Sequence, residues 1–484
     1  MLIGLLHYHL RGGGVTRVIE STVTMLKEHG HDVIVVCGEK TESECIDQLI
    51  THDALRYDVT PDNDQLRSIA DDLEKETKRR FGRVPDLWHF HNHSLGKNTT
   101  APLLVSHWAK KQTPVLLQIH DFAEDGRASN YQFLTRNMGK EQPIPLYPQA
   151  PHIHYATLTR RDQRILSDAG FQDDLLHILP NPVSLGHGTD QDDNARSLFP
   201  ECETLILYPV RGIRRKNIGE FLLHSIIASP DTHFAMTLGP KNPKQQAYYQ
   251  KWVAFARMNN LPVTFEAGHQ QEYSFPSVVQ AADLLMTSSI TEGFGLTFLE
   301  AWLADRPIGG RDLPEITGDF KEKGIVLSHL YSTLPVPLDW LPKKKFEDKV
   351  ENALKQMYHQ YGREYRKEYL QQFLDAALQN ENVDFGRLDE ELQRIVLDKL
   401  LTDSGAGNIL TPCQLQKNIP DTDTTMHNKK LVKRYYSPDA FYERLINIYE
   451  MMIDAPPGPV SYANPELVMD QFLKPDRFYL LKSE

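Results

Sequence analysis

The sequence has few cysteines, no long apolar run and no surplus of basic residues, and each absence argues against a class of protein. Four cysteines without a CxxC pair argue against a disulfide framework and against a zinc site. No stretch reaches the roughly 18 apolar residues that a membrane-spanning helix needs. A formal net charge of −12 argues against a nucleic-acid scaffold, which normally carries a basic surplus.

The start of the sequence also lacks the basic region of a secretory signal peptide. In MLIGLLHYHLRGGG the residues His7 and His9 interrupt the apolar run, so we interpret the stretch as a first strand. We therefore expect a cytoplasmic protein with reduced thiols. The length of 484 residues predicts two domains or more, and an apolar content of 40% is enough for full cores.

Apolar runs alternate with segments of helical spacing along the first 300 residues. A run at residues 2–7 is followed by the glycine cluster Gly12–Gly14, and residues 15–30 then have helical spacing. Strands that are apolar throughout are typical of a parallel sheet covered on both faces, so we predict an α/β fold. Further predicted strands are 32–38, 86–90, 114–120, 152–158, 175–180, 203–210, 232–238, 262–268 and 283–289.

A polar, turn-rich junction at residues 181–200 separates two halves with this alternation. We place a first domain at 1–185, a second at 186–436, and a C-terminal helix with a tail at 437–484. A cleft between two such halves is a natural ligand site, because the carboxyl ends of the strands in both sheets can face it.

Beyond the strands of the second half, the sequence changes character. Charged amphipathic segments predict helices at about 340–402, and we interpret 403–430 as a long loop that includes the DTD at 421–423. Residues 437–452 predict a helix with Ser437 as its N-cap and a proline in its first turn.

The stretch SSITEGFGLTFLEA at 288–301 places two carboxylates around glycines. Glu292 falls in the turn after a predicted strand, and Glu300 falls one turn into the next helix. Gly293 and Gly295 would let backbone N–H groups approach a ligand, and carboxylates accept hydrogen bonds from hydroxyls. Taken alone, the pattern is equally compatible with a ligand site and with a helix whose first turn carries an acidic residue.

A basic stretch, YPVRGIRRKNIGEFL, follows the first strand of the second half. Arg211 and Lys216 lie five residues apart at a strand-to-helix turn, and side chains facing the same cleft would neutralise a diphosphate. We expect Arg214 and Arg215, between them, to belong to a solvated basic loop.

In these two stretches the sequence resembles the retaining GT-B glycosyltransferases of family GT4, which include sucrose-phosphate synthases. Gly12–Gly14 and the pair His120–Asp121 at a strand end are similar to that family as well. The resemblance covers roughly residues 1–320 and the helix at 437–452. The ordered signature consists of Arg211–Lys216, Glu292–Ala301, Gly309–Gly310 and Pro314–Ile316.

The resemblance implies a GT-B architecture of two Rossmann-like domains facing a central cleft, with a helical insertion and a C-terminal helix that returns to the first domain. It implies that a nucleotide sugar binds mainly to the second domain and an acceptor mainly to the first. Under this resemblance the catalytic residues are Arg211, Lys216, Glu292 and His120, and Glu300 holds the ribose. Other implied donor-binding residues are Gly293, Phe294, Gly295, Leu296, Gly13 and Gly14.

The implied reaction is transfer of a hexose from a UDP-glucose or GDP-mannose type donor, with retention of configuration. Cations and N–H dipoles aimed at the diphosphate would stabilise the charge that develops on the leaving group. The resemblance implies a same-face displacement in which the leaving phosphate oxygen takes the acceptor's proton. Glu292 would then orient the sugar and not act as a covalent nucleophile, and we expect no metal or other cofactor.

Basic side chains in the predicted loops of the first domain suit a small anionic acceptor, although they are equally compatible with ordinary surface charge. From these loops we take Arg127, His91 and Lys97 as candidate acceptor-binding residues. His91 also lies in HFHNH, where three histidines have the spacing of metal ligands. We favour strand-end residues there and expect no metal site. The remaining basic residues are Arg11, Arg17, Arg160 and Arg161.

Two other functions stay open. One is a nicotinamide-dependent oxidoreductase, although Arg11-Gly-Gly-Gly-Val does not match G-x-G-x-x-G. The other is a non-catalytic sugar-nucleotide-binding protein on the same fold. We expect a nucleotide sugar and a small acceptor as partners, no nucleic acid and no stable membrane insertion, and we leave self-association open.

Overall fold

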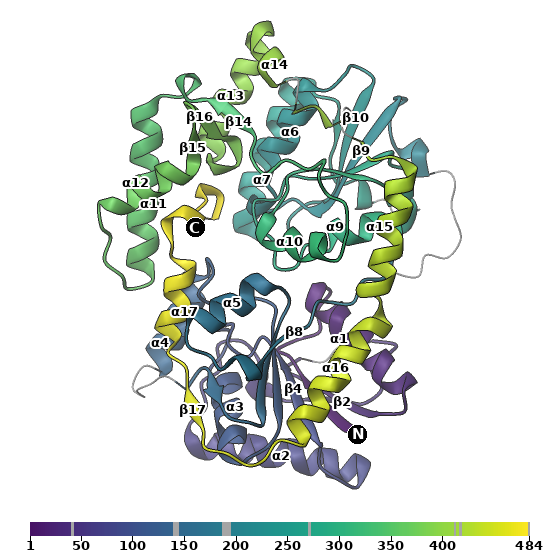
Figure 1. Cartoon of the computed structure of the whole chain (residues 1–484), viewed down its shortest axis with the longest axis vertical. Coiled ribbons are helices and arrows are strands. Elements are labelled where there is room, and N and C mark those ends of the chain that lie inside the picture. Colours follow the sequence, from purple (N-terminus) through teal and green to yellow (C-terminus); the bar gives the residue numbers. More distant parts are fainter. Residues whose placement is uncertain are drawn as a thin grey trace. The chain divides into compact units, whose positions relative to one another are not determined.

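A computed structural model describes residues 1–39, 43–138, 145–185, 195–269, 273–410, 413–415 and 419–482 (Figure 1). The chain divides into two compact units. The first unit comprises Met1–Pro182, Gln360–Arg363 and Tyr436–Lys474. The second comprises Val183–His359, Glu364–Tyr435 and Pro475–Glu484. Of the polar junction expected at 181–200, residues 186–194 lie outside the described residues.

The first unit contains a seven-stranded sheet in the order β3-β2-β1-β4-β5-β7-β8. Every neighbouring pair is parallel, as the apolar runs predicted, because strands buried on both faces need no polar side. The order reverses direction between β1 and β4, which in such sheets marks the ligand-binding edge. The strands are β1 (Leu2–Leu6), β2 (Asp32–Cys37), β3 (Leu49–Thr51), β4 (Leu87–His91), β5 (Val115–Ile119), β7 (Ile153–Thr157) and β8 (Leu176–Ile178).

Helices cover this sheet, and the C-terminal helix α16 (Pro438–Ile453) is one of them (Figure 1). Its buried Phe441 and Leu445 share a hydrophobic cluster with Ile19 and Val23 of α1 (Gly14–Glu28). Ser437 caps α16 by accepting from the N–H of Ala440. The other helices and the short antiparallel pair of this unit are α2 (Asn63–Phe81), α3 (Thr100–Lys110), α4 (Ala128–Met138), α5 (Arg160–Asp168), α17 (Pro465–Phe472), β6 (Pro148–Gln149) and β17 (Ser461–Tyr462).

The second unit contains a five-stranded parallel sheet in the order β11-β10-β9-β12-β13. The order reverses between β9 and β12, so the loops after these two strands flank the switch point. The strands are β9 (Thr204–Arg211), β10 (Thr232–Leu238), β11 (Val263–Thr264), β12 (Leu284–Thr287) and β13 (Ile308–Gly310), and the helices are α6 (Ile218–Ile227), α7 (Pro243–Met258), α8 (Phe275–Gln280), α9 (Thr297–Leu303) and α10 (Pro314–Glu322).

An insertion after α10 adds helices and a small antiparallel sheet to the second unit. A buried ion-pair network ties it to the main sheet: Arg311, directly after β13, contacts Glu220 of α6 and Asp384 at the end of β16. All three side chains are at most 8% exposed. The insertion comprises β14 (Pro335–Pro337), α11 (Lys343–Gln360), α12 (Glu368–Ala377), β15 (Leu378–Gln379), β16 (Asn382–Asp384) and α13 (Glu390–Thr402).

The prediction of a long loop at 403–430 is wrong for most of its described residues. They form α14 (Ser404–Leu410) and α15 (Thr422–Tyr435), and residues 411–412 and 416–418 lie outside the described residues. The helical period of α15 was hidden because its buried face carries the polar residues Thr425 and Asn428. Asn428 bonds the backbone N–H and carbonyl of Val326.

Residues 475–482 belong to the second unit, whereas we expected the whole tail after the helix at 437–452 to accompany the first. The reason is local: Arg477 pairs with Glu315 at 2.6 Å, and Leu480 and Leu481 are buried. In the part of the chain that the structure describes, no helix combines the length and the apolar character that crossing a bilayer requires.

Candidate functional site

The two motif stretches of the second unit meet at the carboxyl edge of its sheet. β9 and β12 are parallel neighbours, so the loop that follows each strand leaves the sheet on the same side. The backbone N–H of Ile290 donates to the carbonyl of Arg215 at 3.0 Å, and Ser288 Oγ donates to the carbonyl of Lys216 at 2.9 Å. These bonds hold the basic loop and the acidic loop together.

Glu292 is held between two cations at this junction. Lys216 Nζ donates to Oε1 of Glu292, and Arg215 Nη1 donates to Oε2 at 2.8 Å. The side chains of Lys216 and Glu292 are 10% and 12% exposed. Burial alone would raise the pKa of Glu292, but Lys216 and Arg215 outweigh it and lower that pKa to about 2. Glu292 is therefore a carboxylate at neutral pH, with both oxygens engaged.

Arg211 has a different partner. It is the last residue of β9, and its Nη1 donates to the carbonyl of Gly239 at 2.9 Å, just beyond the end of β10. The cations that contact Glu292 are thus Lys216 and its neighbour Arg215, and the role predicted for Arg211 stays a prediction.

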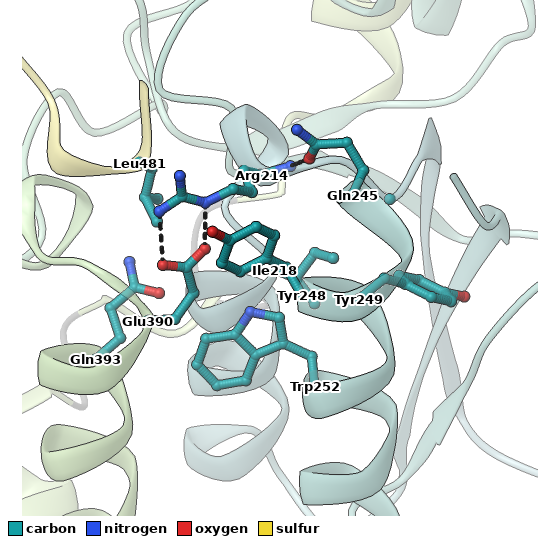
Figure 2. Close-up of a pocket in the computed structure, with 10 residues that line it drawn as sticks. Arg214, Ile218, Gln245, Tyr248, Tyr249, Trp252, Glu390, Gln393 and Leu481 are labelled. Atoms are coloured by element: carbon teal, nitrogen blue, oxygen red, sulfur yellow. Dashed lines mark hydrogen bonds and ion pairs between the residues drawn. The ribbon is translucent and has the colours of Figure 1, made fainter. Parts of the chain in front are cut away.

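The interpretation of Arg214 and Arg215 as a solvated loop is wrong. Arg214 makes a two-bond ion pair with Glu390 of α13, with distances of 2.5 and 2.8 Å, and its guanidinium carbon lies 4.3 Å from the ring centroid of Tyr248. Figure 2 shows this pair in a small pocket between α13 and the loop after β9. The signal that could have found it is the pair of acidic residues, Glu390 and Glu391, opening a predicted helix.

In the acidic loop, Gly295 adopts a backbone conformation that only glycine takes easily. Gly295 has φ +83°, and a Cβ placed there would lie 2.9 Å from Phe298 Cδ2. Phe294 is buried and packs edge-on against Phe320. Leu296 is the N-cap of α9, and Glu300 lies in the first turn of this seven-residue helix. Gly293 and Glu300 therefore flank the turn that follows Glu292.

In the first unit, His120 lies directly after β5 and is 7% exposed. Its backbone N–H and that of Asp121 both donate to Oδ1 of Asn92, at 2.7 and 3.0 Å. Asn92 follows β4 with φ +61°, and the sequence analysis did not single it out. Burial lowers the pKa of His120 to about 4, so its ring is neutral at neutral pH.

The candidate acceptor residues are already engaged with neighbours of the first unit. Arg127 pairs with Asp121 and donates to the carbonyls of Phe122 and Asp125. His91 is fully buried, and its Nδ1 lies 2.9 Å from Nε2 of His120.

Lys97 and the glycine cluster are the remaining candidates of the first unit. Lys97 Nζ lies 5.2 Å from the ring centroid of Tyr57. Gly13 is the N-cap of α1, and a Cβ on Gly12 or Gly14 would meet no atom within 4 Å, so packing within the unit does not require these glycines. Their predicted contacts with phosphate or acceptor stay predictions.

The histidines of HFHNH contact protein groups. His89 contacts the hydroxyl of Tyr449 through Nδ1 and Gln118 through Nε2, and His93 Nε2 donates to the carbonyl of Leu146. Among the described residues, no group of three or more His, Cys, Asp or Glu side chains has the arrangement of a metal site.

Comparison with known proteins identifies the relatives of this chain. Residues 12–187 match the family model described as Glycosyltransferase Family 4. A curated relative, the mannosylglucosyl-3-phosphoglycerate synthase of Petrotoga mobilis, is 25% identical over 412 residues, which cover 81% of this chain and 79% of the relative.

Solved structures share the fold. HepE of Anabaena, in complex with UDP and glucose, gives a TM-score of 0.55 at 10% identity and covers 93% of this chain and 99% of its own. The sucrose-phosphate synthase of Thermosynechococcus elongatus gives 0.52 at 13% identity, covering 93% and 98%. These likenesses confirm the α/β fold of GT-B type, and the family match and the named relative confirm a transferase enzyme of the glycosyltransferase class.

Proposed function

We propose that this chain, a glycosyltransferase with a family 4 domain at residues 12–187, moves a hexose with retention from a nucleotide-diphosphate sugar to a small anionic acceptor. The observation that carries the proposal is the contact of Lys216 and Arg215 with Glu292 at the switch point of the second unit. Two cations suit a diphosphate, and the carboxylate suits the hydroxyls of a sugar.

A UDP-hexose or a GDP-mannose type donor fits this arrangement. HepE, with the same fold, is in complex with UDP and glucose. Under the proposal Glu300 accepts hydrogen bonds from the ribose hydroxyls, while Lys216 holds the diphosphate. Gly295 keeps the acidic loop in the backbone conformation that places Glu292 beside Lys216.

The charges of the site support a dissociative transfer. As the sugar–phosphate bond breaks, negative charge grows on the leaving diphosphate, and Lys216 stabilises it. A carboxylate whose pKa is about 2 cannot donate a proton near neutral pH, so Glu292 does not serve as a general acid. Retention then follows from departure and attack on the same face, with a leaving phosphate oxygen accepting the proton of the acceptor hydroxyl.

An anionic acceptor is supported by the curated relative and by the loops of the first unit. The relative is named for a product that contains 3-phosphoglycerate, which carries phosphate and carboxylate charges. In this chain Arg17 is exposed in the first turn of α1, beside the uncapped Gly12–Gly14 backbone. We propose that a phosphorylated or carboxylated glycoside is the acceptor and that the reaction needs no metal.

The test combines binding and turnover. Thermal shifts of the full chain with UDP-glucose, GDP-mannose, ADP-glucose and NAD identify the donor, and we expect stabilisation by one sugar nucleotide. Transfer to 3-phosphoglycerate and to glucosyl-3-phosphoglycerate is then assayed with and without EDTA, and NMR assigns the anomeric configuration. We expect Lys216→Gln to lower kcat by about 10²–10³-fold. Stabilisation by NAD alone, or an inverted product, would overturn the proposal.

A further inference from the structure

Arg214 and Arg215 are adjacent in the basic loop, but they pair with different glutamates in different surroundings. Arg214 and Glu390 are 11% and 19% exposed, and the pair is flanked by Tyr248 (Figure 2). Arg215 is 39% exposed, and its Nη1 is shared between Oε2 of Glu292 and the carbonyl of Thr291. The first pair is an anchor between α13 and the loop, whereas the second combines a half-exposed guanidinium with a residue of the proposed donor site.

Glu292 supplies the negative charge that lies against Lys216 and Arg215. Lys216 is buried, and burial lowers its pKa while the carboxylate of Glu292 raises it. A buried cation without a counter-ion is strongly unfavourable, so an anion must lie against Lys216 whether or not a substrate is bound. In the structure that anion is a carboxylate with one oxygen on Lys216 and the other on Arg215.

A carboxylate and a phosphoryl group present similar pairs of oxygens to cationic donors. We infer that the Glu292 carboxylate occupies the place of the donor's phosphate oxygens while the site is empty, and that Arg215, together with Lys216, transfers its hydrogen bonds to the diphosphate when the donor binds. This inference rests on the proposed function. It assigns Arg215 to direct contact with the diphosphate, beyond the Arg211 and Lys216 that the sequence indicated.

The exchange of Glu292 for the diphosphate also determines when Glu292 can bind the sugar. While Glu292 pairs with Lys216 and Arg215, both of its oxygens are engaged, and neither is fully available to a hydroxyl. Once a diphosphate neutralises the two cations, the carboxylate is released to accept hydrogen bonds from the hexose. Glu292 thus competes with the diphosphate and becomes available to the sugar only after the diphosphate has bound.

The test measures binding of inorganic pyrophosphate and of UDP to the full chain by calorimetry. Glu292→Gln removes the competing charge and keeps the size, so we expect both anions to bind about tenfold more tightly while turnover falls. Arg215→Gln is expected to weaken both by about tenfold, and Arg257→Gln, on the exposed end of α7, serves as its control.

The control for charge at a distance is Glu390→Gln, which neutralises the carboxylate paired with the neighbouring Arg214. A local exchange predicts that this change leaves pyrophosphate affinity near the wild-type value. Equal tightening by Glu390→Gln and Glu292→Gln, or Arg215→Gln binding like wild type, would overturn the inference. If Glu292→Gln fails to melt cooperatively, Glu292→Asp replaces it: the shorter side chain withdraws the carboxylate from Lys216 and Arg215, so tighter binding of both anions is again expected.

Lys216→Gln distinguishes a failure of the proposed function from a failure of this inference alone. If Lys216→Gln binds pyrophosphate and UDP as well as the wild type does, the diphosphate does not bind at this junction, and the proposed function and this inference are both wrong. If Lys216→Gln weakens binding while Arg215→Gln and Glu292→Gln have no effect, only the exchange is wrong.

Discussion

Nδ1 of His91 lies 2.9 Å from Nε2 of His120, and the two rings stack with centroids 5.2 Å apart. Two bare lone pairs would repel, so one nitrogen donates its proton to the other. If His120 were the donor, the proton of His91 would sit on Nε2, which is buried and has no hydrogen-bond partner among the described residues. A buried N–H without an acceptor is less favourable than an unused acceptor, so His91 donates and His120 carries its proton on Nδ1.

We predict that the wild-type protein shows His120 protonated on Nδ1 in 15N-edited NMR spectra of its histidine side chains. His91→Asn keeps a donor near the same position and should keep this tautomer and most of the activity, whereas His91→Leu should lose both. A His120 ring protonated on Nε2 in the wild type would contradict the assignment, whatever the activities of the variants.

Acid should destabilise the first unit because its sheet buries neutral histidines. The folded protein disfavours their protonation, while the unfolded chain binds protons below about pH 6.5, so stability falls as pH drops from about 6.5 toward 3. Glu124, whose pKa burial raises to about 7, acts in the opposite direction between about pH 4.5 and 7. Burial lowers the pKa of His7 and His89 to about 3 and of His93 and His120 to about 4.

As pH falls through this window, each of the four histidines lowers the free energy of unfolding by up to about 1.4 kcal/mol per pH unit. Together they therefore outweigh the opposite effect of Glu124. Calorimetric melts between pH 7.5 and 4.5 measure the effect above the range in which Glu292 titrates. A melting temperature that stays constant or rises toward pH 5 would contradict the prediction.

The ion-pair network of Arg311 should be a large contributor to the integrity of the second unit. Arg311→Gln leaves Glu220 and Asp384 buried without their shared cation, and breaking such a network costs about 3–5 kcal/mol. Arg477→Gln, which removes a partly exposed pair with Glu315, should cost about 1 kcal/mol or less. Urea unfolding of the two variants compares them directly, and similar midpoints would show that the network is dispensable.

The sequence predicted the two parallel sheets because their strands are apolar throughout, and it predicted α16 from its cap and apolar spacing. It could not predict β14, β15 and β16, whose two or three residues each carry no period. It missed α15 because the buried face of this helix carries the polar residues Thr425 and Asn428, which break the apolar period.

At the site, the sequence brought the basic and acidic stretches together because both follow neighbouring strands. It indicated Arg211 and Lys216 as the cations of the site and interpreted Arg215 as part of a solvated loop, whereas Arg215 contacts Glu292 beside Lys216. Which arginine contacts Glu292 depends on where the loop turns, and the turn is set by Asn217 at φ +51° and by the bond from Ile290 to the Arg215 carbonyl. Side-chain direction in such a loop is a property of tertiary contacts and not of spacing.

Gly295 tests whether the shape of the acidic loop matters to the donor. Gly295→Ala introduces a Cβ at φ +83°, 2.9 Å from Phe298 Cδ2 and 3.2 Å from Ile316 Cγ2, so the loop must shift. Because Glu292, which pairs with Lys216 and Arg215, lies only three residues before Gly295, we expect weaker binding of the donor identified by thermal shift and a lower kcat. Gly318→Ala is the matched control: it lies in α10, where a Cβ meets no atom within 4 Å, and it should leave binding unchanged and stabilise by up to about 1 kcal/mol. Donor affinities that are equal in the two variants would show that the turn at Gly295 serves packing alone.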